Sequence, residues 1–154
     1  MVLEPGDEAP DFTLLDQHGE PFTLSRSVEQ RKVWHLVFFY PKALTSGCTA
    51  QACGLRDVAA AVGGTAIVGI SPDAPPLQAR FDQKHGLGYP LLSDPDHAVA
   101  DAYGVWGEKS MYGRKYMGIV RSAFLVDEEG RIASAWYKVS PVGTAANLLK
   151  ARAG

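Results

Sequence analysis

Two cysteines carry the reactive chemistry that this sequence offers. They lie in the segment Phe39-Tyr40-Pro41-Lys42-Ala43-Leu44-Thr45-Ser46-Gly47-Cys48-Thr49-Ala50-Gln51-Ala52-Cys53, between an apolar run and a helical pattern. Thr45 or Ser46 suits a helix N-cap, which places Cys48 in the first helical turn. There, unpaired backbone N–H groups and the positive end of the helix favour a thiolate, the reactive form, over a thiol. Cys48 is therefore the candidate nucleophile, and a small buried hydrophobe is the alternative.

The spacing of the two cysteines limits what they can do together. Cys53 follows Cys48 by five positions, which on a continuous α-helix separates the two Cα atoms by roughly 8–9 Å. A disulfide tolerates a Cα separation of about 4.4 to 6.8 Å. Either Cys53 is inert, or the first turns of the helix unwind when Cys48 is oxidised. Gly54 weakens the helix at this place, because an interior glycine costs about 0.5–1 kcal/mol relative to alanine.

Composition excludes several other kinds of site. The 154 residues, 46% hydrophobic and 21% charged, predict one globular domain spanning residues 1–154. Net charge is −2 with scattered Lys and Arg, so no basic stripe predicts binding to nucleic acid. Two cysteines and four isolated histidines do not supply the ligands of a structural zinc site. A pair of cysteines in a reducing compartment is more often catalytic or redox-sensing than a permanent disulfide.

Nothing in the pattern predicts a membrane segment. The longest apolar run, Val33 to Tyr40, is interrupted by His35 and is too short to cross a bilayer. The first residues lack the charged start and apolar stretch of a signal peptide. We expect a soluble, cytoplasmic protein with no membrane partner, in which His35 is a structural histidine of a core strand.

The elements that must position the cysteines follow an α/β pattern. We expect a hairpin within 10–24, buried strands at 33–39 and 65–70, and helices before Gly63-Gly64, at 75–85, after Ser93-Asp94-Pro95 and from about Pro141. The first of these helices carries Leu55, Val58 and Val62 on one face. A long loop is expected over 104–120 and strands over 122–126 and 132–139. This order predicts a thioredoxin-like fold with a mixed central sheet, an N-terminal hairpin extension and helices on both faces.

The cysteine segment also resembles that of a known family. Pro41, Thr45 and Cys48 reproduce the Pro-x-x-x-Thr-x-x-Cys signature of peroxiredoxins. Further similarity to the bacterioferritin comigratory, or peroxiredoxin Q, group covers nearly the whole chain. It includes Ala52-Cys53-Gly54-Leu55-Arg56-Asp57, Gly86 to Asp94, Tyr103-Gly104-Val105-Trp106-Gly107 and Gly118-Ile119-Val120-Arg121-Ser122-Ala123-Phe124-Leu125-Val126-Asp127.

The resemblance implies a role for each matching residue. Cys48 matches the peroxidatic cysteine, and Cys53 the resolving cysteine that many, but not all, members have. Thr45 matches the residue whose hydroxyl bonds the thiolate and the peroxide, and Pro41 the residue that shields the thiolate from water. Arg121 matches the arginine that holds the thiolate and polarises the peroxide. Ser46 stands where the group very often has proline, so we expect altered loop stiffness or an extra cap there.

The implied activity is that of an atypical 2-Cys thiol peroxidase. Cys48 would reduce hydrogen peroxide and alkyl hydroperoxides and become a sulfenic acid, which Cys53 would trap as an intrachain disulfide. Thioredoxin or glutaredoxin would then reduce that disulfide by thiol exchange. No metal, flavin or haem is required. Members of the group are often monomers or weak dimers, which is the expectation here.

Two other functions remain open at this level. A thioredoxin-like disulfide oxidoreductase normally uses Cys-x-x-Cys, whereas four residues separate the cysteines here. A redox sensor or a chaperone would work without turnover, and a sensor would react with peroxide once. Peroxide consumption without a disulfide substrate, and turnover with a recycling reductant, would separate these functions from a peroxidase.

Overall fold

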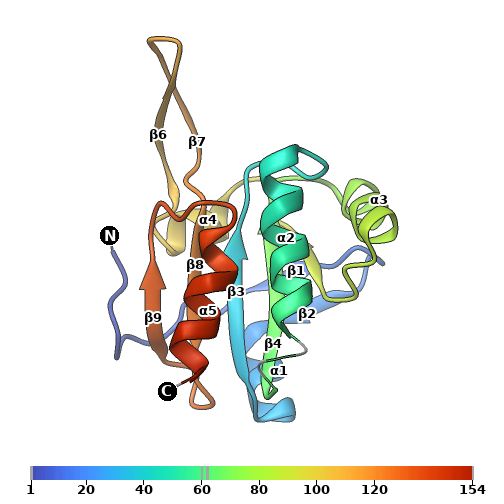
Figure 1. Cartoon of the computed structure of the whole chain (residues 1–154), viewed down its shortest axis with the longest axis vertical. Coiled ribbons are helices and arrows are strands. Elements are labelled where there is room, and N and C mark those ends of the chain that lie inside the picture. Colours follow the sequence, from blue (N-terminus) through green and yellow to red (C-terminus); the bar gives the residue numbers. More distant parts are fainter. Residues whose placement is uncertain (1, 60, 62, 154) are drawn as a thin grey trace.

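The computed structural model describes residues 2–59, 61 and 63–153, in which a seven-stranded sheet of order β2-β1-β5-β4-β3-β8-β9 forms the centre (Figure 1). The elements, in chain order, are β1 (Thr13–Leu15), β2 (Pro21–Thr23), α1 (Leu24–Arg31), β3 (Trp34–Phe39), α2 (Ser46–Ala59), β4 (Thr65–Ser71), α3 (Pro75–His85), β5 (Leu91–Ser93), α4 (Ala98–Ala102), β6 (Trp106–Met111), β7 (Arg114–Ile119), β8 (Ser122–Val126), β9 (Ile132–Trp136) and α5 (Gly143–Ala153).

The central sheet is mixed, as predicted. β3, β4 and β5 run parallel and are joined by crossovers through α2 and α3. β8 pairs antiparallel with β3, and β9 pairs antiparallel with β8. The N-terminal hairpin is also confirmed, and its strand β1 joins the same sheet by pairing antiparallel with β5.

Helices cover both faces of the sheet. Alternate residues of the central strand β3 therefore enter two separate hydrophobic cores. Leu36 and Phe38 pack into one core with residues of α2, α3 and α5, including Leu55, Phe81 and Leu148. Val37 and Phe39 pack into the other core with residues of α1 and α4, including Leu24, Val28 and Val99. Both faces of β3 are therefore buried, which explains why its sequence is nearly all apolar.

The predicted long loop over 104–120 is wrong. These residues form a β-hairpin, β6 and β7, that projects away from the sheet (Figure 1). Its two-residue turn has positive φ at both Tyr112 (52°) and Gly113 (79°), the pattern of a type I′ turn. The glycines and charges of this segment obscure the alternation of a strand. Its side chains are mostly exposed, so no buried face imposes that alternation.

Several boundaries differ from the expectation. Helix α1 and the three-residue strand β5 were not predicted, and β9 ends at Trp136 because Lys138 turns the chain with φ 57°. The predicted position of Val62 on the α2 face lies outside the described residues.

His35 is a structural histidine, as expected. It is fully buried between the Ser27 hydroxyl at 2.8 Å and the Val33 carbonyl at 3.0 Å, and burial lowers its pKa. Its ring therefore completes the polar contacts of β3 and α1 and takes no part in the cysteine chemistry.

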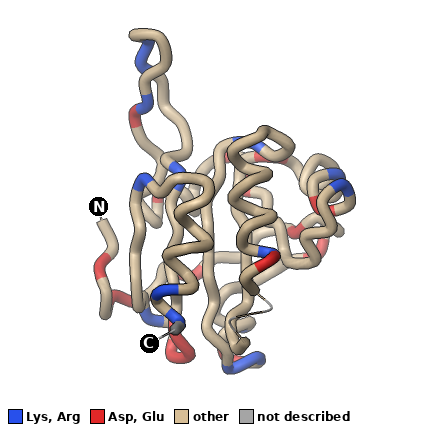
Figure 2. Tube along the Cα trace, in the orientation of Figure 1, with Lys and Arg blue, Asp and Glu red and all other residues tan. Residues whose placement is uncertain are grey.

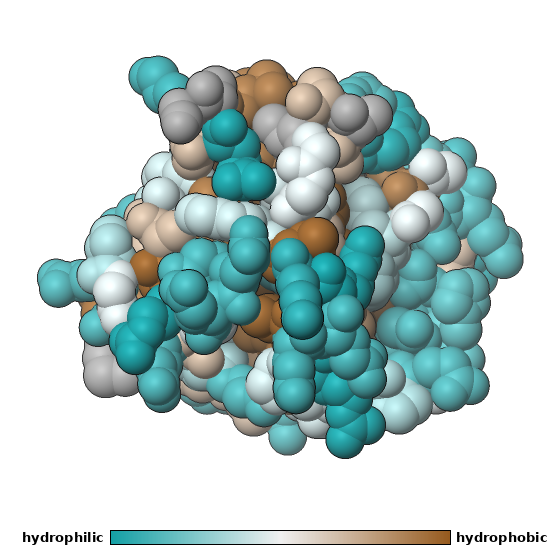
Figure 3. All heavy atoms as spheres, turned by 90° about the horizontal axis from the view of Figure 1, so that it is seen from below, coloured by the Kyte–Doolittle hydropathy of each residue, from teal (hydrophilic) through white to brown (hydrophobic). Residues whose placement is uncertain are grey.

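The surface carries charges of both signs. Figure 2 shows Lys and Arg interspersed with Asp and Glu over the described chain. Hydrophilic residues predominate on the end of the molecule seen in Figure 3. Among the helices of the described residues, none is long and apolar enough to span a bilayer.

Candidate active site

Cys48 lies in the first turn of α2, at the carboxyl end of the central strand β3. The helix begins at Ser46, and its first bond runs from the amide of Thr49 to the carbonyl of Thr45 at 2.9 Å. The preceding amides of the turn have no acceptor within the helix and contribute positive potential near the sulfur. The thiol itself is fully buried. The predicted place of Cys48 at a helix start is confirmed.

Arg121 is the side chain that the fold brings to Cys48. Phe39, the last residue of β3, pairs with Ser122, the first residue of β8, so Arg121 lies beside the end of the strand that leads to the cysteine. Its Nη1 donates to the Cys48 Sγ at 3.4 Å and to the Gln51 Oε1 at 2.8 Å. A guanidinium held this close stabilises negative charge on the sulfur.

A buried polar chain beyond Arg121 was not expected from the sequence. Gln51 is fully buried, and its Nε2 donates to the Thr144 Oγ1 of α5 at 3.0 Å. The hydroxyl of Thr144 donates in turn to the carbonyl of Ser140 at 3.1 Å. This relay, Arg121–Gln51–Thr144, joins α2 to α5 and fixes the guanidinium. The one available signal was a glutamine three residues after Cys48, on the same helical face.

Gly47 leaves the space that the guanidinium occupies. A Cβ at this position would lie 3.2 Å from the Nη2 of Arg121 and 3.5 Å from the Cγ of Pro141. A side chain at residue 47 would therefore push Arg121 away from the sulfur, so the glycine beside Cys48 has a steric role.

A second polar network holds the loop between β3 and α2. The amide of Ala43 donates to the Asp73 Oδ2 at 2.7 Å, and the Ser71 hydroxyl donates to the same oxygen at 2.7 Å. Gln78 donates to the Ser71 Oγ at 2.8 Å and accepts a hydrogen bond from the Tyr40 hydroxyl. Burial raises the pKa of Tyr40, so it stays a neutral donor. The loop is thereby anchored to β4 and α3.

The structure places Thr45 and Pro41 on this loop but shows no bond from either to Cys48. Thr45 is exposed, and its hydroxyl donates to the carbonyl of Lys42 at 2.8 Å. The hydroxyl oxygen can still accept a hydrogen bond from a ligand. Pro41 is half-buried directly after β3. Ser46 occupies the first helical position, which also suits proline, so this departure from the group leaves the helix start in place.

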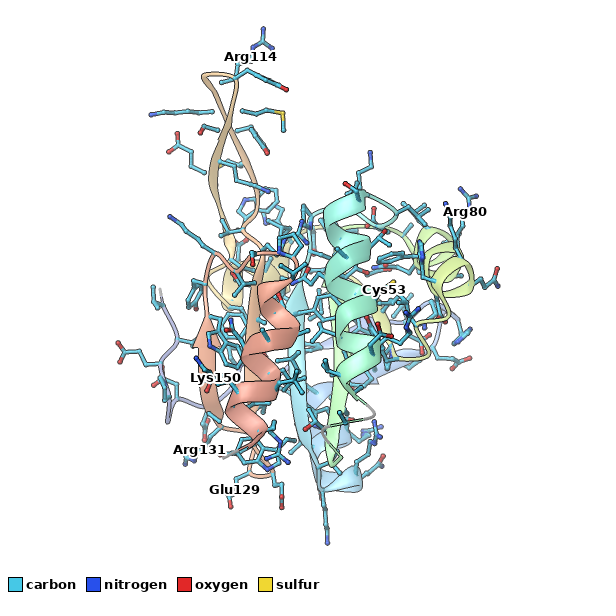
Figure 4. The ribbon with its side chains drawn as sticks, viewed as in Figure 1. Cys53, Arg80, Arg114, Glu129, Arg131 and Lys150 are labelled. Atoms are coloured by element: carbon cyan, nitrogen blue, oxygen red, sulfur yellow. The ribbon has the colours of Figure 1, made fainter. Side chains whose placement is uncertain are left out.

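Cys53 is a free, half-buried thiol on the same unbroken helix as Cys48. It lies on α2 on the side toward α3, and the two cysteines share the core that packs beneath α2 (Figure 4). Because α2 is continuous from Ser46 to Ala59, the two sulfurs cannot bond without unwinding. The next residue, Gly54, faces α5, and a Cβ there would lie 3.4 Å from the Cβ of Ala145.

The projecting hairpin contributes a cation near this site. Lys109 donates to the carbonyl of Ile119, two residues before Arg121, at 2.8 Å. Burial and the positive charge of Arg121 lower the pKa of Lys109, whereas Cys48 raises it. No group of three or more His, Cys, Asp or Glu residues suitable for a metal occurs in the part of the chain that the structure describes.

Comparisons with known proteins decide the family. The model of the AhpC/TSA family matches residues 5–135. The chain belongs to the AhpC/TSA family and is a peroxiredoxin. It is 50% identical to peroxiredoxin Bcp of Escherichia coli over 132 residues, covering 84% of this chain and 83% of that protein. It is 41% identical to peroxiredoxin Bcp of Bacillus subtilis over 141 residues, covering 90% and 88% of the two chains.

Solved structures support the same family. Peroxiredoxin Q of Xanthomonas campestris superposes with a TM-score of 0.85 at 36% identity, covering 99% of this chain and 96% of the other. Peroxidoxin BcpB of Mycobacterium tuberculosis gives a TM-score of 0.83 at 34% identity, covering 98% and 97%. These similarities confirm the thioredoxin-like fold, the bacterioferritin comigratory/peroxiredoxin Q group and the enzyme class, a thiol peroxidase.

Proposed function

We propose that the peroxidase reaction of this chain takes place at Cys48. The observation that carries the proposal is the contact of the Arg121 guanidinium with both the Cys48 sulfur and Gln51. The Cys48 thiolate attacks one oxygen of a hydroperoxide in line with the O–O bond. That bond breaks, the leaving alkoxide or hydroxide takes a proton to give an alcohol or water, and Cys48 becomes a sulfenic acid.

Arg121 and the start of α2 stabilise the charge that develops in this step. The guanidinium is fixed by Gln51 and Thr144 before the peroxide binds, so little reorganisation is needed as charge grows on the leaving oxygen. The Thr45 hydroxyl oxygen accepts a hydrogen bond from the hydroxyl of the peroxide, because the Thr45 hydroxyl already donates to the Lys42 carbonyl. Pro41 covers the sulfur against water.

Cys53 resolves the sulfenic acid. Its thiol attacks the Cys48 sulfur, an intrachain disulfide forms and water leaves. The bond requires the first turns of α2 to unwind, which breaks the contacts of Cys48 and Gln51 with Arg121. A dithiol protein, thioredoxin or glutaredoxin, then reduces the disulfide and α2 refolds.

The substrates are hydrogen peroxide and alkyl hydroperoxides. Support for the second class comes from a related structure whose name refers to the alkyl peroxide reduction activity of the bacterioferritin comigratory protein of Xanthomonas campestris. The chain acts in the cytoplasm as one domain, as a monomer or weak dimer, without membrane or nucleic-acid partners.

Mass mapping after one equivalent of hydrogen peroxide tests the scheme. The expected product is an intrachain Cys48–Cys53 disulfide, and Cys48→Ser should abolish peroxide consumption. A stable sulfenic acid in the unmodified protein, or an interchain dimer, would contradict the role of Cys53. Peroxide consumption by Cys48→Ser would contradict the role of Cys48.

A further inference from the structure

The β6–β7 hairpin is the feature that the peroxide reaction leaves unexplained. It projects beyond the sheet as an isolated two-stranded ribbon (Figures 1 and 4). With strands of six residues and about 3.3 Å per residue, it reaches roughly 20 Å from its base. Such a ribbon gains little stability by itself. Four large apolar side chains are nevertheless exposed near its end, Met111 (56%), Tyr112 (99%), Tyr116 (41%) and Met117 (54%).

The strand register sorts these side chains onto two faces. Lys109 lies opposite Tyr116, and Met111 lies opposite Arg114, so these four share one face, which we call the Lys109 face. The side chains of Glu108, Ser110, Lys115 and Met117 share the other, which we call the Glu108 face. The Lys109 face contains two cations and two apolar side chains and has no acid. The Glu108 face has one ion pair, between Lys115 and Glu108 at 3.7 Å.

The two cations of the Lys109 face have no acidic partner within the described residues, although the Lys109 ammonium donates to the Ile119 carbonyl and lies over the Tyr116 ring. Among the residues that the structure describes, neither Lys109 nor Arg114 forms an ion pair. Figure 4 shows Arg114 at the end of the hairpin, pointing away from the body. Exposed methionine and tyrosine beside arginine is a composition typical of protein interfaces. A matching partner would present carboxylates around an apolar patch.

The base of the hairpin lies two residues before Arg121, which contacts the Cys48 sulfur. β7 ends at Ile119, whose carbonyl binds Lys109, and Arg121 follows two residues later. Burial and the charge of Arg121 lower the pKa of Lys109, whereas Cys48 raises it, so the Lys109 ammonium lies close to both groups. A macromolecule bound along the Lys109 face therefore lies next to the site. A hydroperoxide needs no surface of this size, and the reaction cycle brings only one protein to the site, the dithiol reductant.

We propose that the Lys109 face of the β6–β7 hairpin is the docking surface for the protein dithiol that reduces this enzyme, and that the partner's face around its cysteines is acidic with an apolar centre. The proposal rests on the proposed function, because it needs an oxidised enzyme that a dithiol recycles. Met111 and Tyr116 supply the apolar contact, and Lys109 and Arg114 pair with carboxylates of the partner.

Two adjacent residues of opposite faces give a matched test. Arg114→Glu and Lys115→Glu make the same change of charge one residue apart, on the Lys109 face and the Glu108 face respectively. Peroxide turnover is measured with thioredoxin as the protein reductant and with dithiothreitol, which is too small to need docking. The ratio of the two rates isolates docking from chemistry. Absence of peroxide consumption with dithiothreitol would contradict the proposed function and not the docking surface.

In Arg114→Glu the thioredoxin-to-dithiothreitol ratio should fall about tenfold, because reversing an interface charge slows association. Lys115→Glu should leave the ratio within about twofold of the unmodified enzyme. Met111→Ser should lower the ratio without a change of charge, and Met117→Ser is its matched control. In the unmodified enzyme the ratio should also fall as ionic strength rises, and this dependence should weaken in Arg114→Glu.

Three results would overturn the proposal. The first is an equal fall of the thioredoxin-to-dithiothreitol ratio in Arg114→Glu and Lys115→Glu, which would indicate a general attraction of thioredoxin to the charge of the enzyme. The second is an unchanged ratio in both Arg114→Glu and Met111→Ser. The third is an unchanged ratio together with binding to phosphatidylglycerol vesicles that Arg114→Glu abolishes, which would assign the face to a lipid surface.

Discussion

The two cysteines lie on one helix, yet they differ in burial and in the contacts that surround them. Cys48 is fully buried and contacts Arg121, a residue 73 positions away that the pairing of β3 with β8 brings into place. Cys53 is half-buried, and the carbonyl before it accepts a hydrogen bond from Tyr89 at 2.8 Å. The position of Cys48 is therefore set by long-range sheet register. The accessibility of Cys53 is set by the local stability of α2.

Among the variants that test this difference between the two cysteines, Arg121→Met should have the largest effect. Loss of the fixed donor should slow oxidation of Cys48 by hydrogen peroxide about 100- to 1,000-fold, the usual cost of losing a preorganised charge-stabilising donor. The second-order rate is measured by stopped-flow competition for peroxide. Arg121→Lys is the control. Its rate should lie between the rates of the unmodified enzyme and Arg121→Met, because lysine keeps the charge but lacks the planar guanidinium. A loss below threefold in Arg121→Met would show that the helix start alone activates Cys48.

Cys53→Ser should affect the second step of the cycle. We expect Cys48 to be oxidised at a rate near that of the unmodified enzyme, and thioredoxin-supported turnover to fall at least about tenfold because no intrachain disulfide forms. Mass spectrometry should then detect a sulfenic acid, followed by a sulfinic acid as peroxide increases. Undiminished turnover would mean that an external thiol resolves Cys48 directly.

A smaller effect is expected from Gln51→Met, which removes the acceptor that fixes Arg121. Peroxide reactivity should fall about tenfold, and the free energy of unfolding by about 1–3 kcal/mol, because polar partners are left unpaired in the interior. Denaturant titration and stopped-flow kinetics measure the two quantities. Thr144→Val breaks only the far end of the relay, so it should lower stability with a smaller loss of rate. Equal kinetic losses in both variants would contradict a positioning role specific to Gln51.

The smallest effect concerns Gly54→Ala, which stabilises α2 without touching either thiol. The added methyl would meet Ala145 at 3.4 Å, an ordinary contact, so the substitution fits the folded helix. A gain of about 0.5–1 kcal/mol in helix stability should slow disulfide formation roughly two- to fivefold. Rapid quenching with mass analysis separates this step from oxidation. A rate of disulfide formation that is unaffected would show that unwinding does not extend to Gly54.

What the sequence predicted well depended on strong local patterns or on the family signature. The central strands and α3 have long apolar or capped patterns, and their predicted bounds match within a residue or two. Arg121 was found only through its resemblance to the peroxiredoxin block, since a lone arginine gives no sign of its partner. Its contact with Cys48 now gives that assignment a geometric basis.

The missed features have long-range causes. Gln51 and Thr144 meet because α2 packs on α5, and Asp73 reaches Ala43 because β4 lies beside β3. No local spacing encodes these pairs. The sequence predicts a loop in place of the β6–β7 hairpin because exposed strands need no apolar alternation. That residues 1–154 form a single domain stays a prediction.

The short backbone between β7 and β8 has a consequence for communication within the enzyme. Val120 donates to the carbonyl of Val105 at 2.7 Å, and the carbonyl of Arg121 accepts from Val139 at 2.9 Å, so this stretch is clamped on both sides. The hairpin and the guanidinium therefore share one rigid connection. If a partner bound at the hairpin changes the affinity of the Cys48 site for a ligand by some factor, a ligand bound at Cys48 must change the affinity of the hairpin for that partner by the same factor. A binding measurement at either end then reports the state of the other.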